Sequence, residues 1–364
     1  MSGMESPFST SGPPRDPAAQ DGSDPSGRMT QPSPPGRSLW RTAAERGCRL
    51  ILIAASLPPI GWIFGKLSWV VDLFSHFPLQ AACGALVAAI VLGLLRRTPW
   101  LMVAVAILLV DLAPLAWLSV PVSQPASEGP KVRICAANTF IDNLDGDRVV
   151  DVIRREQPDI LYVSELSSTI DQAVRESGLF PHAYTRATNE SPWGAGFYSR
   201  WPIRGTRLLP AEYGCPSMIV EIDVEGERLT AVGAHPPPPA GGKLTNFRNR
   251  SIAQAAEWIA QAEGPVVLCG DLNTTPWSHA FRELVQVSGL RDARCGHGLQ
   301  LTWPTHFIPY RIPIDHVLVS REIAVRGHRI GGQTGSDHFP VVVDLQLSGP
   351  ERTDTAQPSD SAMR

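Results

Sequence analysis

Charged residues are scarce in this chain. They make up 18% of its 364 residues, below the roughly 25% typical of soluble domains, so part of the chain must be markedly apolar. The net charge of -3 gives no overall attraction to polyanions and argues against a protein that coats nucleic acid. The six cysteines include no Cys-x-x-Cys pair, which excludes a disulfide-dense scaffold and a structural zinc ribbon.

The two ends of the chain also lack apolar residues. Residues 1–36 contain eight Pro, five Gly and seven Ser, a composition that cannot bury enough surface to offset the entropy of ordering. Residues 349–364 are similarly polar. We predict two disordered tails, 1–36 and 349–364. The proline-containing stretch 121–130 indicates a linker.

Long apolar runs are concentrated in one part of the chain, residues 37–120. They cover about 50–71, 77–95 and 100–120, and each is close to the ~20 residues that a helix needs to cross a bilayer. A cleavable signal peptide is the alternative for the first run, but its start near residue 50 and the two later runs argue against it. The sequence therefore predicts a membrane anchor of three transmembrane helices.

Arginines predict how this anchor is oriented. Arg37, Arg41, Arg46 and Arg49 precede the first run, and Arg96 and Arg97 separate the second from the third, whereas the loop between the first and second runs has no arginine. Lys and Arg accumulate in short cytoplasmic loops. We expect a multi-pass protein of the cell membrane whose N-terminus is cytoplasmic and whose chain after residue 120 is extracytoplasmic.

Residues 131–348 have the mixture of polar and apolar residues typical of a globular domain, and their strand-like runs share one feature. Each short apolar run begins or ends with a polar residue. Strand ends and strand starts share one edge in a sheet with antiparallel members. Any one of these residues could be an ordinary turn residue, but together they supply metal ligands and acid/base groups. The set comprises Asn138, Glu165, His235, Asp271, Asn273, Asp315, Asp337 and His338.

Hydrolysis of a phosphate ester needs such a set of residues. Attack on phosphorus requires neutralised oxygens, an activated water and a stabilised leaving group, all held in line. Mg²⁺ takes carboxylate and other hard oxygen ligands. The chain has no thiolate cluster and no His-x-x-x-His pair. The sequence therefore favours Mg²⁺, with Mn²⁺ as the alternative, over zinc or a cysteine nucleophile.

The same motifs resemble the endonuclease/exonuclease/phosphatase superfamily with the deoxyribonuclease-like fold. They are Ala-Ala-Asn138-Thr-Phe, Tyr-Val-Ser-Glu165, Gly196-Phe-Tyr-Ser-Arg-Trp-Pro-Ile203, His235, Gly270-Asp-Leu-Asn273, Ile314-Asp-His316 and Gly335-Ser-Asp-His-Phe-Pro340. They occur in the family's order from Val132 to Leu347. The resemblance implies a four-layer α/β sandwich behind the three transmembrane helices. The anchor together with Gly-Asp-Leu-Asn-Thr-Thr-Pro-Trp-Ser looks like the bacterial membrane-anchored branch.

The resemblance also implies a role for each residue. Glu165 is the principal metal ligand, with Asn138 and Asp337 at or beside the metal. Asp271 orients or deprotonates the attacking water, and Asn273 holds a phosphate oxygen. His338, oriented by Asp315, contacts the scissile phosphate, and His235 stabilises the developing charge. Arg250 is either a further phosphate contact or a surface cation of its helix.

The segment after His235 departs from what a DNA-gripping member would present. Four prolines, 236–239, stiffen it without supplying Lys or Arg to follow a duplex backbone. Trp193, Trp201, Trp277 and Trp303 fall in expected loops, where they either stack on a base, meet lipid headgroups or pack in the core. Cys135, Cys215, Cys269 and Cys295 lie in the same domain, and buried thiols are expected for Cys135 and Cys269.

We therefore expect a membrane-anchored, extracytoplasmic, metal-dependent phosphoesterase. Its substrate would be a small phosphate ester, a lipid headgroup or a nucleic acid, and no protein partner can be predicted from the sequence. A nuclease acting on extracellular DNA or RNA and a catalytically silent, membrane-tethered binding module remain the alternatives. Retention of the full set of polar residues argues against the silent module.

Overall fold

The computed structural model describes residues 36–126, 128–210 and 214–348. The chain divides into two compact units, Met1–Ala43 and Ala44–Arg364. The two predicted tails lie outside the described residues, except for Gly36, where the first helix begins. The contacts between helices and strands that form the fold and the site lie within the unit Ala44–Arg364.

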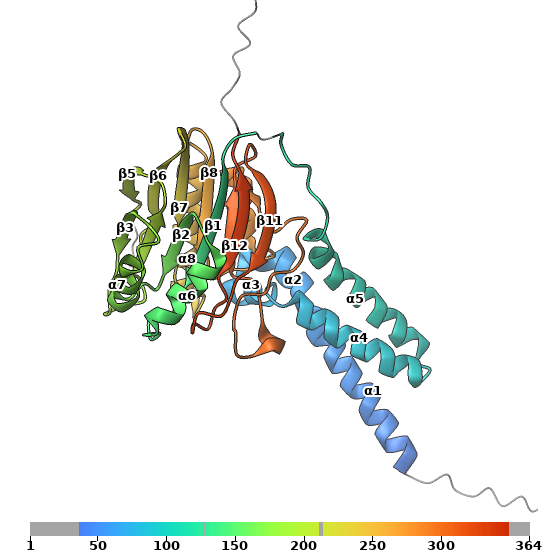
Figure 1. Cartoon of the computed structure of the whole chain (residues 1–364). Coiled ribbons are helices and arrows are strands. Elements are labelled where there is room, and N and C mark those ends of the chain that lie inside the picture. The colour runs from blue at the N-terminus through green and yellow to red at the C-terminus, as the bar shows by residue number, and fades with distance from the viewer. Residues whose placement is uncertain (1–35, 127, 211–213, 349–364) are drawn as a thin grey trace, which may run out of the picture. The chain divides into compact units, whose positions relative to one another are not determined.

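The apolar part of the chain forms helices of unequal length (Figure 1). They are α1 (Gly36–Ala55), α2 (Leu57–Phe64), the 3-10 turn η1 (Gly65–Leu67), α3 (Trp69–Phe74), α4 (Pro78–Leu94) and α5 (Thr98–Trp117). Two stretches, Leu39–Leu67 and Thr98–Trp117, are long and apolar enough to cross a membrane, whereas α4 has 17 residues.

Within the described residues two helices, rather than the expected three, are therefore long and apolar enough to cross a membrane, and α4 is the one that falls short. The first apolar run still counts as one of the two, but it differs from the expected helix over 50–71, because α2 restarts with Pro58 in its first turn, and proline has no N–H to continue the hydrogen-bond ladder. The run ends in the short helix α3, which is separated from η1 by the extended residue Ser68.

The first sheet has the strand order β11-β12-β1-β2-β4-β3. Within it β1 and β2 are parallel, and the other neighbours are antiparallel. The strands are β1 (Lys131–Asn138), β2 (Ile160–Ser164), β3 (His182–Arg186), β4 (Ala195–Ser199), β11 (Ala324–Ile330) and β12 (Val341–Gln346).

The second sheet repeats this pattern with the order β5-β6-β7-β8-β10-β9. Here β7 and β8 are the parallel pair, and β8 and β10 are antiparallel. The strands are β5 (Ile203–Leu208), β6 (Met218–Val224), β7 (Glu227–Gly233), β8 (Val266–Asp271), β9 (Arg291–Asp292) and β10 (Asp315–Val319).

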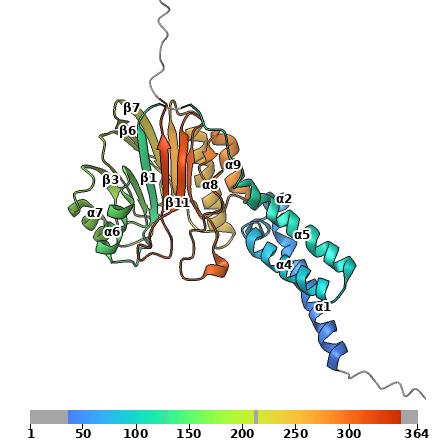
Figure 2. The ribbon, with the colours of Figure 1, turned by 45° about the vertical axis from the view of Figure 1, so that its right-hand side comes forward.

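Helices cover the outer faces of the two sheets (Figure 2). One core, which includes Ile134 and Val220, lies between the sheets. A second lies between the first sheet and the helices α6 (Gly146–Glu156) and α7 (Ser168–Glu176). A third lies between the second sheet and the helices α8 (Gly242–Ile259) and α9 (His279–Ser288). A 3-10 turn, η2 (Ile308–Tyr310), lies in the loop before β10. The result is the layered α/β arrangement that the sequence predicts.

One edge of this sandwich collects strand ends from both sheets. Asn138 is the last residue of β1 and pairs with Ser164, the last residue of β2. Asp271, the last residue of β8, pairs with Asp315, the first residue of β10. The alternation of parallel and antiparallel neighbours therefore places the polar residues of six strands at one edge.

A glycine lets β8 approach this edge closely. Gly270 has φ +133°, and a Cβ there would lie 2.2 Å from the carbonyl oxygen of Ala234. The ring of Tyr162 from the opposite sheet fills the space next to it. Only glycine fits at this position, directly before Asp271.

Candidate active site

Asn138 connects two carboxylates at the edge of the sandwich. Its Nδ2 lies 2.9 Å from Glu165 Oε1 and 3.1 Å from Asp271 Oδ2. Glu165 follows β2 with φ +52°, and its Oε2 accepts a hydrogen bond from the backbone N–H of Ile141 at 3.0 Å. The amide and the backbone hold the two carboxylates close together although they belong to different sheets.

His338 and Asp315 form a second pair on the same edge. His338 Nδ1 lies 2.9 Å from Asp315 Oδ2, and its Nε2 lies 3.7 Å from Asp271 Oδ2. Burial alone would lower the pKa of His338, but the carboxylates of Asp315 and Asp271 outweigh it and raise that pKa to about 10. His338 is therefore a buried imidazolium at neutral pH.

Asp271 lies at the centre of the group. Its Oδ1 accepts a hydrogen bond from the backbone N–H of Asn273 at 2.8 Å. Burial raises the pKa of Asp271 to about 7, with the Asp315 carboxylate acting in the same direction. A carboxylate with such a pKa can accept a proton near neutral pH.

His235 approaches the two carboxylates from the loop after β7. Its Nε2 lies 3.7 Å from Glu165 Oε1 and 3.6 Å from Asp271 Oδ2. Burial lowers the pKa of His235, and the nearby positive charge of His338 contributes to the same effect. The two histidines therefore differ in charge, because His338 has its own carboxylate partner.

Asp337 lies at the border of the site with a partner that the sequence did not identify. The indole Nε1 of Trp303 donates to Asp337 Oδ2 at 2.8 Å, and Asp337 Oδ1 is 4.0 Å from His338 Nε2. The indole N–H fixes the orientation of the carboxylate. Trp193 lies on another side, with its ring centroid 5.6 Å from that of His235.

Asn273 completes the predicted set. It has φ +48°, and its Nδ2 donates to the carbonyl oxygen of Pro236 at 3.0 Å. The stiff segment after His235 and the loop after β8 are therefore connected. All eight residues predicted from the sequence lie at this one edge of the sandwich.

Arg248 is a residue near the site that the sequence analysis missed. Its Nη1 donates to the carbonyl oxygen of Asn273 at 3.1 Å, whereas Arg250, the arginine named in advance, stacks on Phe247 with its Cζ 4.9 Å from the ring centroid. The sequence did contain a pattern that could have identified Arg248. Arg248 falls on the buried face of α8, in helical register with Thr245 and Ile252, and an arginine on a buried face must be paired.

The donor chemistry of this edge fits a hard divalent cation. Ligand atoms of Asp271, Asp315 and His338 lie within 4.8 Å of one another, and Glu165 and Asn138 adjoin them. Four carboxylates face one histidine that is charged at neutral pH. The excess of negative charge and of oxygen donors is what Mg²⁺ requires in a protein site.

The remaining tryptophans and cysteines belong to the packing. Trp201 packs against the core between the sheets, and Trp277 packs with Leu115 and Leu118 at the end of α5. Cys135 and Cys269 are buried free thiols, as expected.

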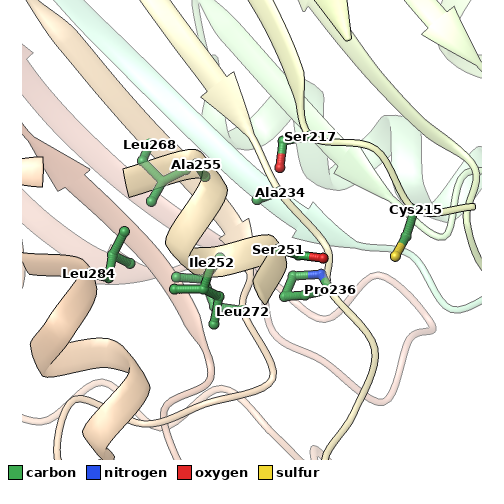
Figure 3. A pocket seen from close by; sticks show the side chains of 10 residues that line it. All are labelled: Cys215, Ser217, Ala234, Pro236, Ser251, Ile252, Ala255, Leu268, Leu272 and Leu284. Carbon is green, nitrogen blue, oxygen red and sulfur yellow. The ribbon is translucent and has the colours of Figure 1, made fainter. Parts of the chain in front are cut away.

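A small apolar pocket lies under α8 (Figure 3). Its walls include Ile252, Ala255 and Leu284, together with Pro236 and Leu272. Its volume of about 10 Å³ leaves room for one water molecule at most. It is a packing defect behind the site rather than a substrate cavity.

Comparisons with known proteins relate the chain to a family and to a fold. The sequence profile of the Endonuclease/Exonuclease/phosphatase family matches residues 135–338, more than half of the chain. No curated protein matches the chain.

Several solved structures share the fold. A humanized TDP2 from D. rerio is 15% identical with a TM-score of 0.51, and the match covers 60% of this chain and 99% of that one. TDP2 from D. rerio complexed with single strand DNA product is 16% identical, with the same TM-score of 0.51 and the same coverage of 60% and 99%. An endonuclease/exonuclease/phosphatase from Bacteroides vulgatus is 18% identical with a TM-score of 0.50, over 60% of this chain and 100% of that one. Identities this low show a common fold and nothing finer.

Proposed function

Because the chain belongs to the endonuclease/exonuclease/phosphatase family, whose members are hydrolases that act on phosphoester bonds, we propose that it is a membrane-anchored, extracytoplasmic, Mg²⁺-dependent phosphoesterase. The observation that supports this proposal best is the meeting of Glu165, Asn138 and Asp271 from two sheets beside the His338–Asp315 pair. This edge combines hard oxygen ligands, a proton acceptor and a fixed cation.

Glu165 is the principal ligand of the metal in this proposal, with Asn138 and Asp337 at or beside it. Mn²⁺ is the alternative ion. Asp315 and His338 are less suited to hold the cation, because they already neutralise each other at 2.9 Å. A bound divalent cation would supply charge neutralisation for the phosphate oxygens.

The protein side chains would perform the remaining steps. Asp271 orients the attacking water and takes its proton, for which its pKa of about 7 is suited. Asp315 orients His338 and stabilises its protonated form, and His338 contacts a phosphate oxygen. Asn273 holds another oxygen, and His235 stabilises the charge that develops on the opposite side.

The contacts of the apolar helices support the proposed topology. Glu45 pairs with Arg97 at 2.9 Å, and Arg49 lies over the ring of Trp100 at 4.4 Å, so the arginine-rich ends of α1, α4 and α5 lie together. The opposite end of α4 begins close to His76, which contacts Thr275 of the domain 131–348. We propose that α4 nevertheless forms a third crossing, and three crossings would place the arginines on the cytoplasmic side and the domain outside.

The length of α4 does not prevent such a crossing. Its 17 residues span about 26 Å at 1.5 Å per residue, a few ångströms less than a typical hydrocarbon core. Flanking residues and local thinning of the bilayer compensate for a mismatch of this size.

A nuclease is the second candidate. Trp193 and Trp303 lie on two sides of the site, where bases of a single strand could stack. The TDP2 structure of the same fold was determined with a single strand DNA product. The domain offers little charge for this purpose, since residues 131–347 contain 21 Lys and Arg against 24 Asp and Glu. The tetraproline also brings no cation to the border of the site.

The proposal is tested with the full-length chain in detergent and a panel of substrates. The panel contains p-nitrophenyl phosphate, bis(p-nitrophenyl) phosphate, a single-stranded oligonucleotide and phospholipid vesicles, each with Mg²⁺ and with chelator. Mg²⁺-dependent hydrolysis of one class supports the phosphoesterase and identifies its substrate class. Absence of hydrolysis of all four together with saturable Mn²⁺ binding would instead indicate the silent binding module.

A further inference from the structure

A buried ion pair joins the segment between the apolar helices to the catalytic domain. Asp72 of α3 and Arg248 of α8 are 176 positions apart in sequence, and Asp72 Oδ2 lies 3.1 Å from Arg248 Nη2. Their side chains are 6% and 0% exposed. Breaking a buried pair by removing one partner leaves an uncompensated charge and is strongly unfavourable.

The Asp72 carboxylate also contacts the next helix. Its Oδ1 accepts a hydrogen bond from the backbone N–H of His279 at 3.0 Å, and His279 is the first residue of α9. A few residues further along the same segment, His76 Nδ1 lies 2.8 Å from Thr275 Oγ1. The segment 72–76 therefore contacts α8, α9 and the loop that follows β8.

Arg248 connects Asp72 to the active site. One end of its guanidinium pairs with Asp72, and Nη1 donates to the carbonyl oxygen of Asn273. Asn273 has a left-handed backbone conformation, which is uncommon for a residue other than glycine and must be maintained by its surroundings. Its N–H donates to Asp271 and its side chain to Pro236, so a shift of Asn273 would displace both.

We propose that Asp72 is a positioning residue for the active site, acting through Arg248 on the backbone of Asn273. The inference rests on the proposed function of the site. In this arrangement the domain 131–348 is incomplete by itself, because the carboxylate that pairs with Arg248 belongs to the anchor. Phosphoesterase activity therefore depends on docking of the domain against the segment between the first two apolar helices.

The test uses the full-length chain in detergent, bis(p-nitrophenyl) phosphate with Mg²⁺, and hydrogen exchange of the amides in 271–275. Asp72→Asn preserves the size of the side chain and an acceptor for His279 but removes the charge that holds Arg248. We expect kcat/KM to fall at least tenfold, mainly in kcat, and the amides of Leu272 and Asn273 to exchange at least tenfold faster.

Arg282→Gln is the matched control. Arg282 of α9 donates to the carbonyl oxygens of Trp62 in α2 and of Ser278, so it also joins the anchor to the domain, but these hydrogen bonds do not involve Arg248 or residues 271–275. Kinetics and exchange within twofold of the wild type are expected for this variant.

A double variant separates positioning from stability. Asp72→Asn combined with Arg248→Met removes both buried charges, so the unfolding temperature should recover relative to Asp72→Asn, while kcat and the exchange rate should remain impaired because Asn273 has lost its donor. If activity instead returns with the unfolding temperature, Asp72 has only a stabilising role and the proposal is overturned.

Hydrogen exchange distinguishes this inference from the proposed function. If the wild-type chain does not hydrolyse the probe, the phosphoesterase assignment fails for that substrate class. The exchange data alone then test whether Asp72 positions the loop. Faster exchange at 271–275 in Asp72→Asn but not in Arg282→Gln supports positioning of the loop, and unchanged exchange overturns it.

Discussion

His338 Nδ1 lies 2.9 Å from Asp315 Oδ2, and both side chains are buried although they are 23 positions apart in sequence. The pair joins the start of β10 in one sheet to the residues before β12 in the other. The carboxylate fixes the tautomer of the imidazole and, with Asp271, raises its pKa to about 10. The site therefore holds a fixed positive charge beside the residue proposed to activate water.

This pairing predicts strong non-additivity between two substitutions. Asp315→Asn and His338→Ala should each lower kcat/KM by about 100-fold or more, the range expected for loss of an acid/base group. The kcat/KM of the double variant should be little lower than that of the worse single variant, because both substitutions remove the same interaction. Steady-state kinetics and thermal unfolding of all three variants measure this. Additive losses that follow the unfolding temperature would mean that the pair serves stability alone.

The proposed orientation in the membrane predicts the outcome of reporter fusions. Alkaline phosphatase fused after residue 125 should be active, because the chain after α5 is proposed to be exported. The same reporter fused after Arg97 should be inactive, because the loop between α4 and α5 carries Arg96 and Arg97 and is proposed to be cytoplasmic. High reporter activity for the fusion after Arg97 and none for the fusion after residue 125 would show the opposite orientation in the membrane.

His76 predicts a loss of stability in acid. Burial lowers its pKa to about 4, with Arg248 contributing, against about 6.5 in the unfolded chain. A histidine that is neutral when folded binds its proton more tightly when unfolded, so its contribution to stability is complete above pH 6.5 and is lost as the pH falls toward 4. The slope is up to roughly 1.4 kcal/mol per pH unit.

The measurement is the free energy of unfolding in detergent between pH 7 and pH 4. His76→Asn keeps a partner for Thr275 without a group that titrates in this window, so its stability should fall less steeply with decreasing pH than that of the wild type. Identical slopes in the two proteins would show that His76 does not govern the acid sensitivity.

The sequence predicted the catalytic domain better than the anchor. The positions of Asn138, Glu165, Asp271 and Asp315 follow from local rules, since each marks the end or start of a short apolar strand, and strand ends meet at one edge. Their distances could not be predicted, because they depend on how two sheets pack. Gly270, which lets β8 approach Ala234, is an example of a detail that only the packed structure explains.

The anchor shows the limit of hydropathy. Residues 50–71 read as one apolar run, yet Pro58 restarts the helix and the chain then forms α3, which the average hydropathy conceals. Asp72 follows this run like an ordinary loop residue. Its partner Arg248 lies 176 positions away, and no local pattern around either residue connects the two.

The most direct test of the proposed function is the Mg²⁺ dependence of bis(p-nitrophenyl) phosphate hydrolysis by the full-length chain and its Glu165→Gln variant. The variant keeps the size of the side chain but removes the negative charge that a hard cation requires, and Glu263→Gln, in an exposed loop, is the control. We predict that chelator abolishes wild-type and control activity, that Mg²⁺ restores it, and that Glu165→Gln is at least about 100-fold slower at saturating substrate and needs more Mg²⁺. Hydrolysis by the wild type that persists in chelator, or an unchanged Mg²⁺ dependence in Glu165→Gln, would contradict the assignment of a metal-dependent phosphoesterase site to this edge of the sandwich.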